Sequence, residues 1–266
     1  MQQMTLEVLI SCMHQSDWSI IQRSNIQTDV LIINQCDRDA VEEYSFPNQL
    51  GKICHARMIH TTTRGLSRSR NMALRYASGD ICVFCDDDEI FESDYEQTIL
   101  NAFQTHVDFT IIAFKLNYDR KKCPTKTRTY NRFTSGSLSS AQIAFRRQDI
   151  IATSILFDEK MGSGTGNGGG EECKWMYQLL SKREVKAMYV PMLIATVQSG
   201  NSMWFHGYNK QFFINQGWKS RRIYGRILGL VYIFYNIIAH QKLYTTQYCS
   251  NIDIIHYMLT GYMQKR

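Results

Sequence analysis

Short apolar runs alternate with longer segments of helical periodicity from the start of the chain to about Val190. This alternation is typical of a mainly parallel sheet whose two faces are covered by helices. We expect strands at Leu6–Ser11, Val30–Ile33, Arg57–Ile59, Ile81–Cys85, Phe109–Phe114, Ala141–Phe145 and Val185–Val190. We expect helices at Asp17–Ser24, Ser67–Tyr76, Asp94–Phe103 and Glu171–Ser181. The pattern therefore predicts an α/β fold with a mixed, mainly parallel sheet flanked by helices.

Three local signals mark boundaries within this pattern. Ser93 followed by Glu96 is a capping-box pattern, which predicts a helix start because such side chains satisfy free amides of the first turn. Pro191 is expected to end the sheet-forming part of the chain. Six glycines lie between Met161 and Gly170, a density that no helix or strand interior tolerates. This segment should be a mobile loop or a loop that other segments approach closely.

The chain beyond the sheet pattern is aromatic and basic. We therefore divide the chain into a main domain at 1–200 and a helical C-terminal extension at 201–266. The apolar run Ile227–Ala239 is shorter than the ~20 residues that a membrane-spanning helix needs, so an integral anchor is not expected. Two interpretations stay open: a buried C-terminal helix or, because the basic segment Lys219–Arg226 precedes it, an interfacial helix on a membrane.

Composition and charge narrow the class of protein. Hydrophobic residues at 44% and charged residues at 20% are typical of a packed globular chain and exclude wholesale disorder. The net charge of +6 suits anionic partners such as nucleotides or phospholipid headgroups, but it does not indicate nucleic acid. Eight scattered cysteines without a signal peptide suggest reduced thiols in a cytosol. Cys82 and Cys85 should point to opposite faces of one strand, which argues against a metal or redox pair.

The strongest sign of chemistry is a cluster of four acidic residues, Asp86–Glu89, directly after the strand Ile81–Cys85. Ligand sites in open α/β sheets form at the carboxyl ends of the strands. In extended geometry Asp86 and Asp88 would point to one side and Asp87 to the other. A divalent cation would relieve the repulsion between the two converging carboxylates, and oxygen ligands suit Mg²⁺ or Mn²⁺. The alternative is an acidic loop before the next helix.

The segment Gly65–Asn71 offers a second anion-binding feature. A glycine followed by Ser67 at a helix start would present free backbone amides, together with Arg68 and Arg70, to an anion. The alternative is a solvated basic helix face. The sequence contains no serine nucleophile elbow, Walker loop or zinc-ligand spacing that would compete with this set.

Four segments together resemble the family 2 glycosyltransferases of the GT-A fold, and the aromatic stretch Trp204–Trp218 resembles members that build bacterial surface polysaccharides. The four segments are the opening strand Leu6–Cys12, Gly65–Asn71, the strand-then-aspartate motif Phe84–Asp88 and the glycine loop ending in Gly170–Glu172, in the order of the family. The similarity covers roughly residues 5–215. It implies a GT-A type, Rossmann-like fold with a nucleotide-sugar donor.

The resemblance also implies roles for individual residues. The residues implied at the donor are Ser11, Cys12, Met13, Asn34, Asp37, Arg68, Arg70, Asp86 and Asp87. Asp88 would ligate a Mn²⁺ or Mg²⁺ ion together with Asp86. Relatives often place a further ligand after the last core strand, where this chain has His206 and Gln198; a purely structural role for His206 is the alternative.

Catalysis in the family needs a base that deprotonates the acceptor hydroxyl. The resemblance assigns Glu172 as that base and Glu171 as its support, although the helix dipole alone would also favour carboxylates at a helix start. Aromatic residues from Trp204 to Trp218 either pack in a core or contact an acceptor sugar.

The implied function is that of an inverting, metal-dependent hexosyltransferase. The family's commonest donor is a UDP-sugar, and the acceptor would be a hydroxyl of a saccharide or a lipid-linked acceptor in surface polysaccharide assembly. We expect a cytoplasmic protein with peripheral contact to the inner face of the plasma membrane. Two alternatives are a sugar nucleotidyltransferase, which also binds a metal with acidic residues after a strand, and a non-catalytic protein that binds a nucleotide sugar.

Overall fold

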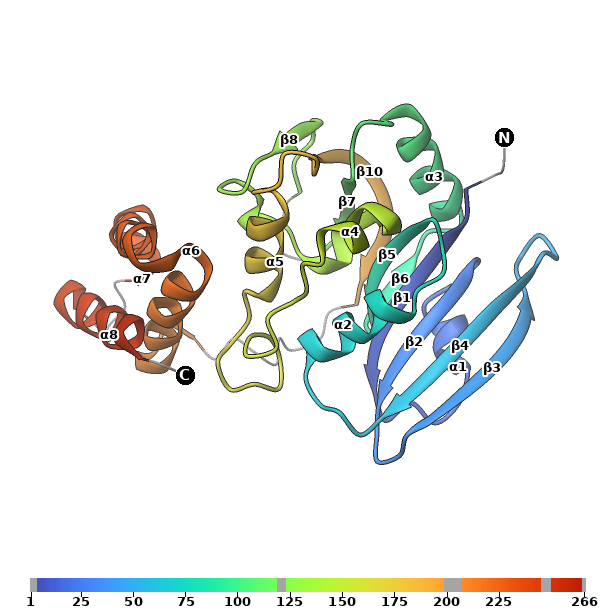
Figure 1. The fold of residues 1–266 in the computed structure, drawn as a ribbon, viewed down its shortest axis with the longest axis horizontal. Coiled ribbons are helices and arrows are strands. Elements are labelled where there is room, and N and C mark those ends of the chain that lie inside the picture. Colours follow the sequence, from blue (N-terminus) through green and yellow to red (C-terminus); the bar gives the residue numbers. More distant parts are fainter. Residues whose placement is uncertain (1–3, 119–122, 199–206, 245–249, 265–266) are drawn as a thin grey trace.

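A ten-stranded sheet forms the centre of the protein in the computed structural model, which describes residues 4–118, 123–198, 207–244 and 250–264 (Figure 1). The strands are β1 Leu6–Met13, β2 Asp29–Gln35, β3 Ala40–Pro47, β4 Ile53–Thr61, β5 Ile81–Asp86, β6 Glu89–Phe91, β7 Ile111–Asn117, β8 Arg128–Tyr130, β9 Ile143–Arg146 and β10 Ala187–Val197. Their order is β3-β4-β2-β1-β5-β9-β7-β10-β6, with β8 beside β10. The pairs β4/β2, β2/β1, β1/β5 and β7/β10 are parallel, and the others are antiparallel.

Helices cover both faces of this sheet. The helices are α1 Ser19–Arg23, α2 Leu66–Tyr76, α3 Tyr95–Thr105, α4 Arg147–Thr153, α5 Glu171–Leu179, α6 Lys210–Ala239, α7 Gln241–Tyr244 and α8 Asn251–Met263. Side chains alternate along β1, so Val8 and Ile10 join the core under α1 and α3, whereas Leu9 joins the core under α2, α4 and α5. The expected α/β fold class is confirmed, with every predicted strand and helix present at shifted bounds.

Two predicted boundaries are wrong. The helix α3 begins at Tyr95 behind Asp94, which makes no side-chain cap bond, so the pattern of Ser93 and Glu96 does not mark its start. The strand β10 runs through Pro191 to Val197 instead of ending there. The pairing of β10 with β7 changes register between Tyr189 and Leu193, and this irregularity accommodates a residue that cannot donate to a sheet ladder.

The sequence pattern missed elements that bury little apolar surface. The edge strand β3 exposes most of its side chains, so it carries no clear core signal. The strands β6 and β8 are three residues long, and α4 buries only Ile150 among its described side chains. Such elements are held by neighbouring strands more than by their own pattern.

Helices α6 to α8 form a helical lobe on the side of the molecule away from β3 and β4 (Figure 1). The lobe has a hydrophobic cluster of its own, built around Phe213, Ile233 and Met258. A β-carbon added to Gly217 would lie 1.8 Å from the Met258 carbonyl oxygen, so glycine lets α6 and α8 pack at close range. The division at residue 200 stays a prediction, because residues 199–206 lie outside the described chain.

The cysteines follow the expectation of free thiols in the described part of the chain. Cys82 lies in the core under α2 and Cys85 in the core under α1 and α3, which confirms that they point to opposite faces. Burial raises the pKa of both thiols well above its usual range.

Candidate active site

The acidic cluster forms a tight turn at the carboxyl edge of the sheet. Asp86 is the last residue of β5, where it pairs with Ser11 of β1, and Asp87 and Asp88 form the turn before β6. The expected extended alternation of the three aspartates is therefore wrong. The carboxylates come together because the chain reverses, and the two turn residues are exposed.

The pKa values of both turn residues are raised. Although both side chains reach solvent, partial desolvation by the surrounding chain and then the charge of Asp86 raise the pKa of Asp87. Partial desolvation, followed by the charges of Asp86 and Asp87, raises the pKa of Asp88. Behind them Glu89 is buried, and its Oε1 accepts a hydrogen bond from the Asp86 amide at 3.2 Å. The Glu89 Oε2 atom is buried without a hydrogen-bond partner among the described residues, and burial raises the pKa of this carboxyl well above its usual range.

A single buried arginine, Arg70 of α2, connects the acidic turn to the start of α5. Its guanidinium lies 3.2 Å from Asp86 Oδ1, 3.2 Å from Glu171 Oε1 and 3.1 Å from Glu172 Oε1. Arg70 also donates to the Ser140 hydroxyl at 2.5 Å. Burial alone would lower the pKa of Arg70, but the three carboxylates outweigh it and keep the guanidinium charged. We call this set, Arg70 with Asp86, Ser140, Glu171 and Glu172, the arginine node.

The two glutamates of the node differ in accessibility. Both follow Gly170, whose φ of 109° lets the chain enter α5. The Glu171 side chain is 3% exposed, and burial together with the charge of Glu172 raises its pKa to about 7. The Glu172 side chain is 18% exposed and accepts a hydrogen bond from Ser140 at 3.2 Å. A substrate can therefore reach Glu172, whereas Glu171 is enclosed.

The glycine loop packs against the start of α2. The Ser67 hydroxyl donates to the Met161 carbonyl at 2.7 Å, and the Leu66 amide donates to the Ser163 carbonyl at 3.2 Å. A β-carbon on Gly162 would lie 3.0 Å from the Ser67 hydroxyl and 3.1 Å from Glu171 Cδ. Of the two predicted loop types, the structure therefore shows the loop that other segments approach closely.

This packing changes the surroundings of the expected anion site at Gly65–Asn71. The first amide of α2 is taken by the glycine loop, Arg70 turns inward to the carboxylates, and Arg68 pairs with Glu159 at 3.2 Å. The geometry makes Arg70 a residue that positions carboxylates. A direct contact of Arg68 or Arg70 with the donor stays a prediction.

The other residues predicted at the donor surround the end of β1. Ser11 and Cys12 are buried, and Met13 is exposed at the rim. Asn34 is fully buried. Its side-chain oxygen accepts a hydrogen bond from the Gln15 amide, and its side-chain nitrogen donates to the Gln15 carbonyl. Asn34 therefore supports the loop after β1 instead of facing a base. Asp37 is exposed and pairs with Arg64 at 2.6 Å.

The end of β10 returns to the acidic turn. The Gln198 amide donates to the Asp88 carbonyl at 2.8 Å, so Gln198 itself lies beside the predicted metal ligand. His206 lies outside the described residues, and its part as a ligand stays a prediction. Within the described chain, His, Cys, Asp and Glu side chains form no group of three or more that could hold a metal ion.

Sequence reasoning missed the contacts between the helical lobe and α5. Asp158 binds both Lys174 of α5 and Arg222 of α6, whose Nη2 lies 2.7 Å from Asp158 Oδ1. The Lys219 side chain lies against Gly170, where an added β-carbon would be 3.1 Å from Lys219 Cδ. A lone aspartate in a loop carries no sequence signal for such a role, because both partners come from distant segments.

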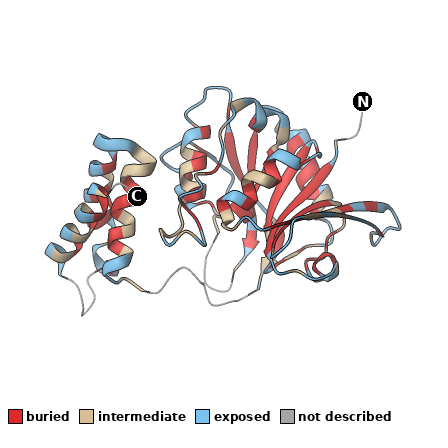
Figure 2. Ribbon diagram, turned by 60° about the horizontal axis from the view of Figure 1, so that its bottom comes forward, coloured by how far each residue is buried: buried red, intermediate tan, exposed pale blue. Residues whose placement is uncertain are grey.

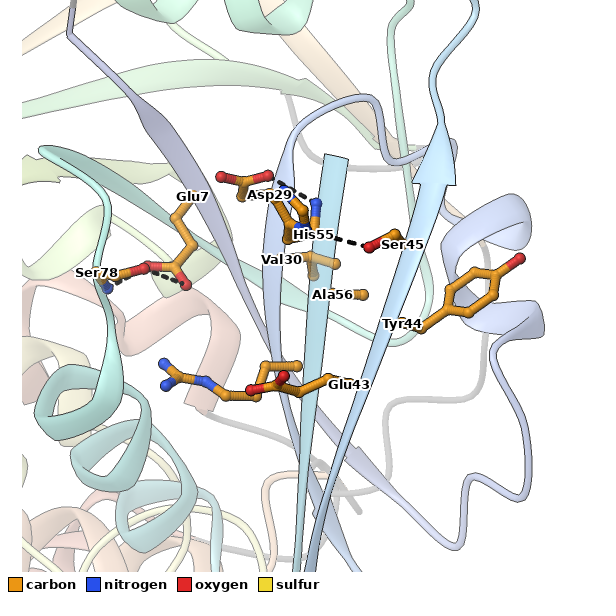
Figure 3. Close-up of a pocket in the computed structure, with 10 residues that line it drawn as sticks. Glu7, Asp29, Val30, Glu43, Tyr44, Ser45, His55, Ala56 and Ser78 are labelled. Atoms are coloured by element: carbon orange, nitrogen blue, oxygen red, sulfur yellow. Dashed lines mark hydrogen bonds between the residues drawn. The ribbon is translucent and has the colours of Figure 1, made fainter. Parts of the chain in front are cut away.

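A hollow of about 370 Å³ lies away from the arginine node, at the amino ends of β1 and β2 (Figure 3). Glu7, which lines it, accepts hydrogen bonds from the amides of Ser78 and Gly79 at 2.5 and 2.8 Å. Glu7 thus fixes the turn after α2. Its carboxylate is therefore satisfied within the chain.

The family model described as "Glycosyl transferase family 2" matches residues 7–161, more than half of the chain. The chain belongs to this family. It is 24% identical over 147 residues to a protein of Haemophilus influenzae named "Uncharacterized glycosyltransferase". The match covers 54% of this chain and 43% of that relative, so the chain spans less than half of the relative's length.

Solved structures of Staphylococcus aureus TarS have the same fold as this chain. A TarS 1–349 structure in complex with UDP-GlcNAc matches with a TM-score of 0.58 at 12% identity, over 97% of this chain and 72% of that chain. A longer TarS structure matches with a TM-score of 0.57 at 11% identity, over 92% and 44%. The likeness confirms the expected GT-A type fold.

The family match covers only part of the arginine node. It includes Arg70, the acidic turn and Ser140, but it ends before Glu171 and Glu172. The candidate base is therefore tied to the matched region by its contacts with Arg70 and Ser140.

Proposed function

We propose that this glycosyltransferase is an inverting, metal-dependent hexosyltransferase that moves a sugar from a UDP-sugar to a hydroxyl of a saccharide or lipid-linked acceptor. One observation carries the proposal. Glu172, whose carboxylate a substrate can reach, pairs with the same buried arginine, Arg70, as Asp86 of the acidic turn. A base and a metal-binding edge are thus held together at the carboxyl end of the sheet, where ligands of such folds bind.

The charge balance of the site supports a requirement for a divalent cation. Six carboxyl groups gather at the turn and the start of α5, and Arg70 is the basic residue that pairs with them there. A diphosphate would add further negative charge. Asp86 and Asp88 supply hard oxygen ligands that fit Mg²⁺ or Mn²⁺, which complete their coordination with water and phosphate oxygens. When bound, the cation would stabilise the charge of the departing diphosphate.

Glu172 suits the role of general base. Its Oε1 is held by Arg70 and Ser140, so the carboxylate has a fixed position before substrate binds. It would accept the proton of the acceptor hydroxyl as the hydroxyl oxygen attacks the anomeric carbon of the donor. Glu171 stays enclosed behind it and supports its position. A single displacement from the side opposite the leaving group inverts the anomeric carbon.

The proposal extends to the donor, the pathway and the compartment. One TarS structure holds UDP-GlcNAc, which supports a uridine diphosphate donor for a chain of the same fold. We place the enzyme in surface polysaccharide assembly in the cytoplasm, at the inner face of the plasma membrane. The free thiols of the described cysteines are compatible with a reducing compartment.

The decisive experiment incubates the full chain with labelled nucleotide sugars, Mn²⁺ and saccharide acceptors. We expect a product whose anomeric configuration, read from proton coupling constants, is opposite to that of the donor. Glu172→Gln should lower transfer by about a hundred- to ten-thousand-fold with donor binding preserved. Asp88→Asn should abolish Mn²⁺-dependent nucleotide binding in calorimetry, while Asp108→Asn, an exposed site before β7, should not.

The outcomes separate the alternatives. A product that retains the donor configuration, or near-normal turnover of Glu172→Gln, would contradict the assigned mechanism. Binding of the donor without transfer under any condition would indicate the non-catalytic protein, and pyrophosphate-dependent cleavage would indicate a nucleotidyltransferase.

A further inference from the structure

The second half of α6 carries an exposed apolar stripe. Gly225, with φ 77° and ψ −166°, interrupts the helix, and a straight segment follows from Arg226 to Ala239. Ile227, Val231, Phe234 and Ile238 are spaced four, three and four residues apart, so they share one helix face. Their side chains are 49–80% exposed. We call these four residues the α6 stripe.

The segment 226–239 has two apolar faces. One is packed in the core of the lobe, and the α6 stripe is the other. Ile233 and Ile237 of the same segment are buried in the lobe's core against Phe213 and Met258. Leu230 and Tyr235 widen the exposed side, and Figure 2 shows exposed stretches along the lobe's helices. A contiguous exposed apolar surface on a folded chain marks an interaction site.

Charge indicates the kind of partner. The residues from Lys210 to Lys242 include no Asp or Glu. Exposed cations stand at both ends of the stripe, Arg226 directly before Ile227 and Lys242 shortly after Ala239. An apolar stripe between cations is the pattern of a helix that lies in the plane of an anionic lipid surface.

We propose that the α6 stripe docks this protein onto an anionic membrane. Among the described residues, α6 is the helix that is long and apolar enough to cross a membrane by length and composition. The break at Gly225 leaves ~14 residues in the straight apolar segment, or ~21 Å, which is shorter than the ~30 Å hydrocarbon core. The segment therefore lies on the membrane and does not cross it.

A second copy of the chain is a poorer occupant of this face. In an antiparallel pair of stripes, Arg226 of each copy would meet Lys242 of the other, and a parallel pair would bring each cation against its own kind. The segment offers no carboxylate to compensate this repulsion. Anionic lipid supplies the missing negative charge over the whole face.

Docking would place the active site beside the membrane, which on the proposed function brings Glu172 to a lipid-linked acceptor. The first half of α6 binds Asp158 through Arg222 and lies against Gly170 through Lys219. The helix that meets the lipid thus also supports the loop and the helix that carry the base. Vesicle binding itself needs neither donor nor acceptor, so it tests the docking surface separately from the activity.

Vesicle flotation of the full chain tests the surface. We expect the wild type to float with vesicles of phosphatidylglycerol and phosphatidylcholine at low salt, and less with pure phosphatidylcholine or at 0.5 M salt. The triple variant Ile227→Ser, Phe234→Ser, Ile238→Ser should bind at least about tenfold more weakly. Leu50→Ser with Val107→Ser, two exposed sites outside the lobe, is the matched control and should bind like the wild type.

Further outcomes decide the proposal. The double variant Arg226→Glu, Lys242→Glu should also weaken binding. This double variant and the triple variant should both keep wild-type transfer to a soluble saccharide. A wild type that stays in solution with anionic vesicles, or a triple variant that floats like the wild type, would overturn the proposal. So would a concentration-dependent dimer in sedimentation analysis that the triple substitution dissociates, because the stripe would then be a contact between copies.

Discussion

In the sheet domain charged groups are buried, whereas in the helical lobe apolar groups are exposed. Arg70 and Glu171 lie inside the sheet domain as an ion pair, although Arg and Glu are rarely fully buried in proteins. Ile227 and Ile238 lie on the surface of the lobe, where they are 80% and 75% exposed. Each region departs from the usual burial of apolar side chains and exposure of charged ones in the way that its proposed task requires. A catalytic centre needs fixed charges at low hydration, and a membrane surface needs an accessible apolar face.

The departures have different consequences for stability. Buried charges depend on one another, so removal of one partner leaves the others uncompensated. Exposed apolar groups depend on nothing within the chain, so their replacement should be close to neutral for folding. Substitutions of the buried charges should therefore change stability strongly, whereas substitutions of the exposed apolar groups should leave stability nearly unchanged.

The largest effect is expected at the centre of the node. Arg70→Met keeps the length of the side chain but leaves Asp86, Glu171 and Glu172 without their cation. We expect a loss of about 3–5 kcal/mol in the free energy of unfolding, measured by urea denaturation at pH 7. Arg75→Met, an exposed position on the same helix, is the matched control and should change it by less than about 0.5 kcal/mol. Equal losses in the two variants would mean that the node does not carry the stability of α2.

The pH dependence of stability should reveal the enclosed glutamate. The pKa of Glu171 is raised from 4.5 to about 7 in the folded chain, so the folded state binds its proton more tightly than the unfolded state. The stabilisation from this group is complete below pH 4.5 and is lost as the pH rises to 7, a change on the order of 3 kcal/mol. The stability of Glu171→Gln relative to the wild type should therefore increase over this window.

The same pH series needs a control for the loss of a carboxylate. Glu184→Gln changes an exposed residue outside the node. If Glu171→Gln and Glu184→Gln show the same pH dependence relative to the wild type, Glu171 is not the group that titrates in this window.

The sequence predicted the parts of the site that come from continuous segments. The strand Ile81–Cys85 and its acidic turn, the glycine loop and the acidic pair at the start of α5 could all be read as local patterns. The expectation failed where a role depends on tertiary partners. A sequence shows that Arg70 is basic, but it does not show that three carboxylates from two distant segments surround it. Ser140 and Asp158 carry no local signal for the same reason.

The fold shows the same division between local and tertiary information. Central strands such as β1 and β5 bury both faces, so their apolar runs identify them. The edge strand β3 exposes most of its side chains and was missed. For the run Ile227–Ala239 the sequence left a buried and an interfacial helix open, and the structure gives it one buried face and one exposed apolar face.

The smallest expected effect is also the one that separates the two regions most directly. In an exposed helix, replacement of glycine by alanine stabilises a protein by up to about 1 kcal/mol. At Gly217 the added methyl would lie 1.8 Å from the Met258 carbonyl oxygen, a backbone atom that cannot turn away. We therefore expect Gly217→Ala to reverse the usual sign and to destabilise the packing of α6 on α8 by about 1–3 kcal/mol.

Hydrogen exchange measured by mass spectrometry should show faster exchange in α6 and α8 and unchanged exchange in β1 and β5. Gly261→Ala should give the same pattern, because its added methyl would meet the Ile214 carbonyl oxygen at the same crossing. Slower exchange in the lobe would show that the two helices do not pack at this distance, and faster exchange throughout the sheet would show that lobe and sheet domain unfold as one unit.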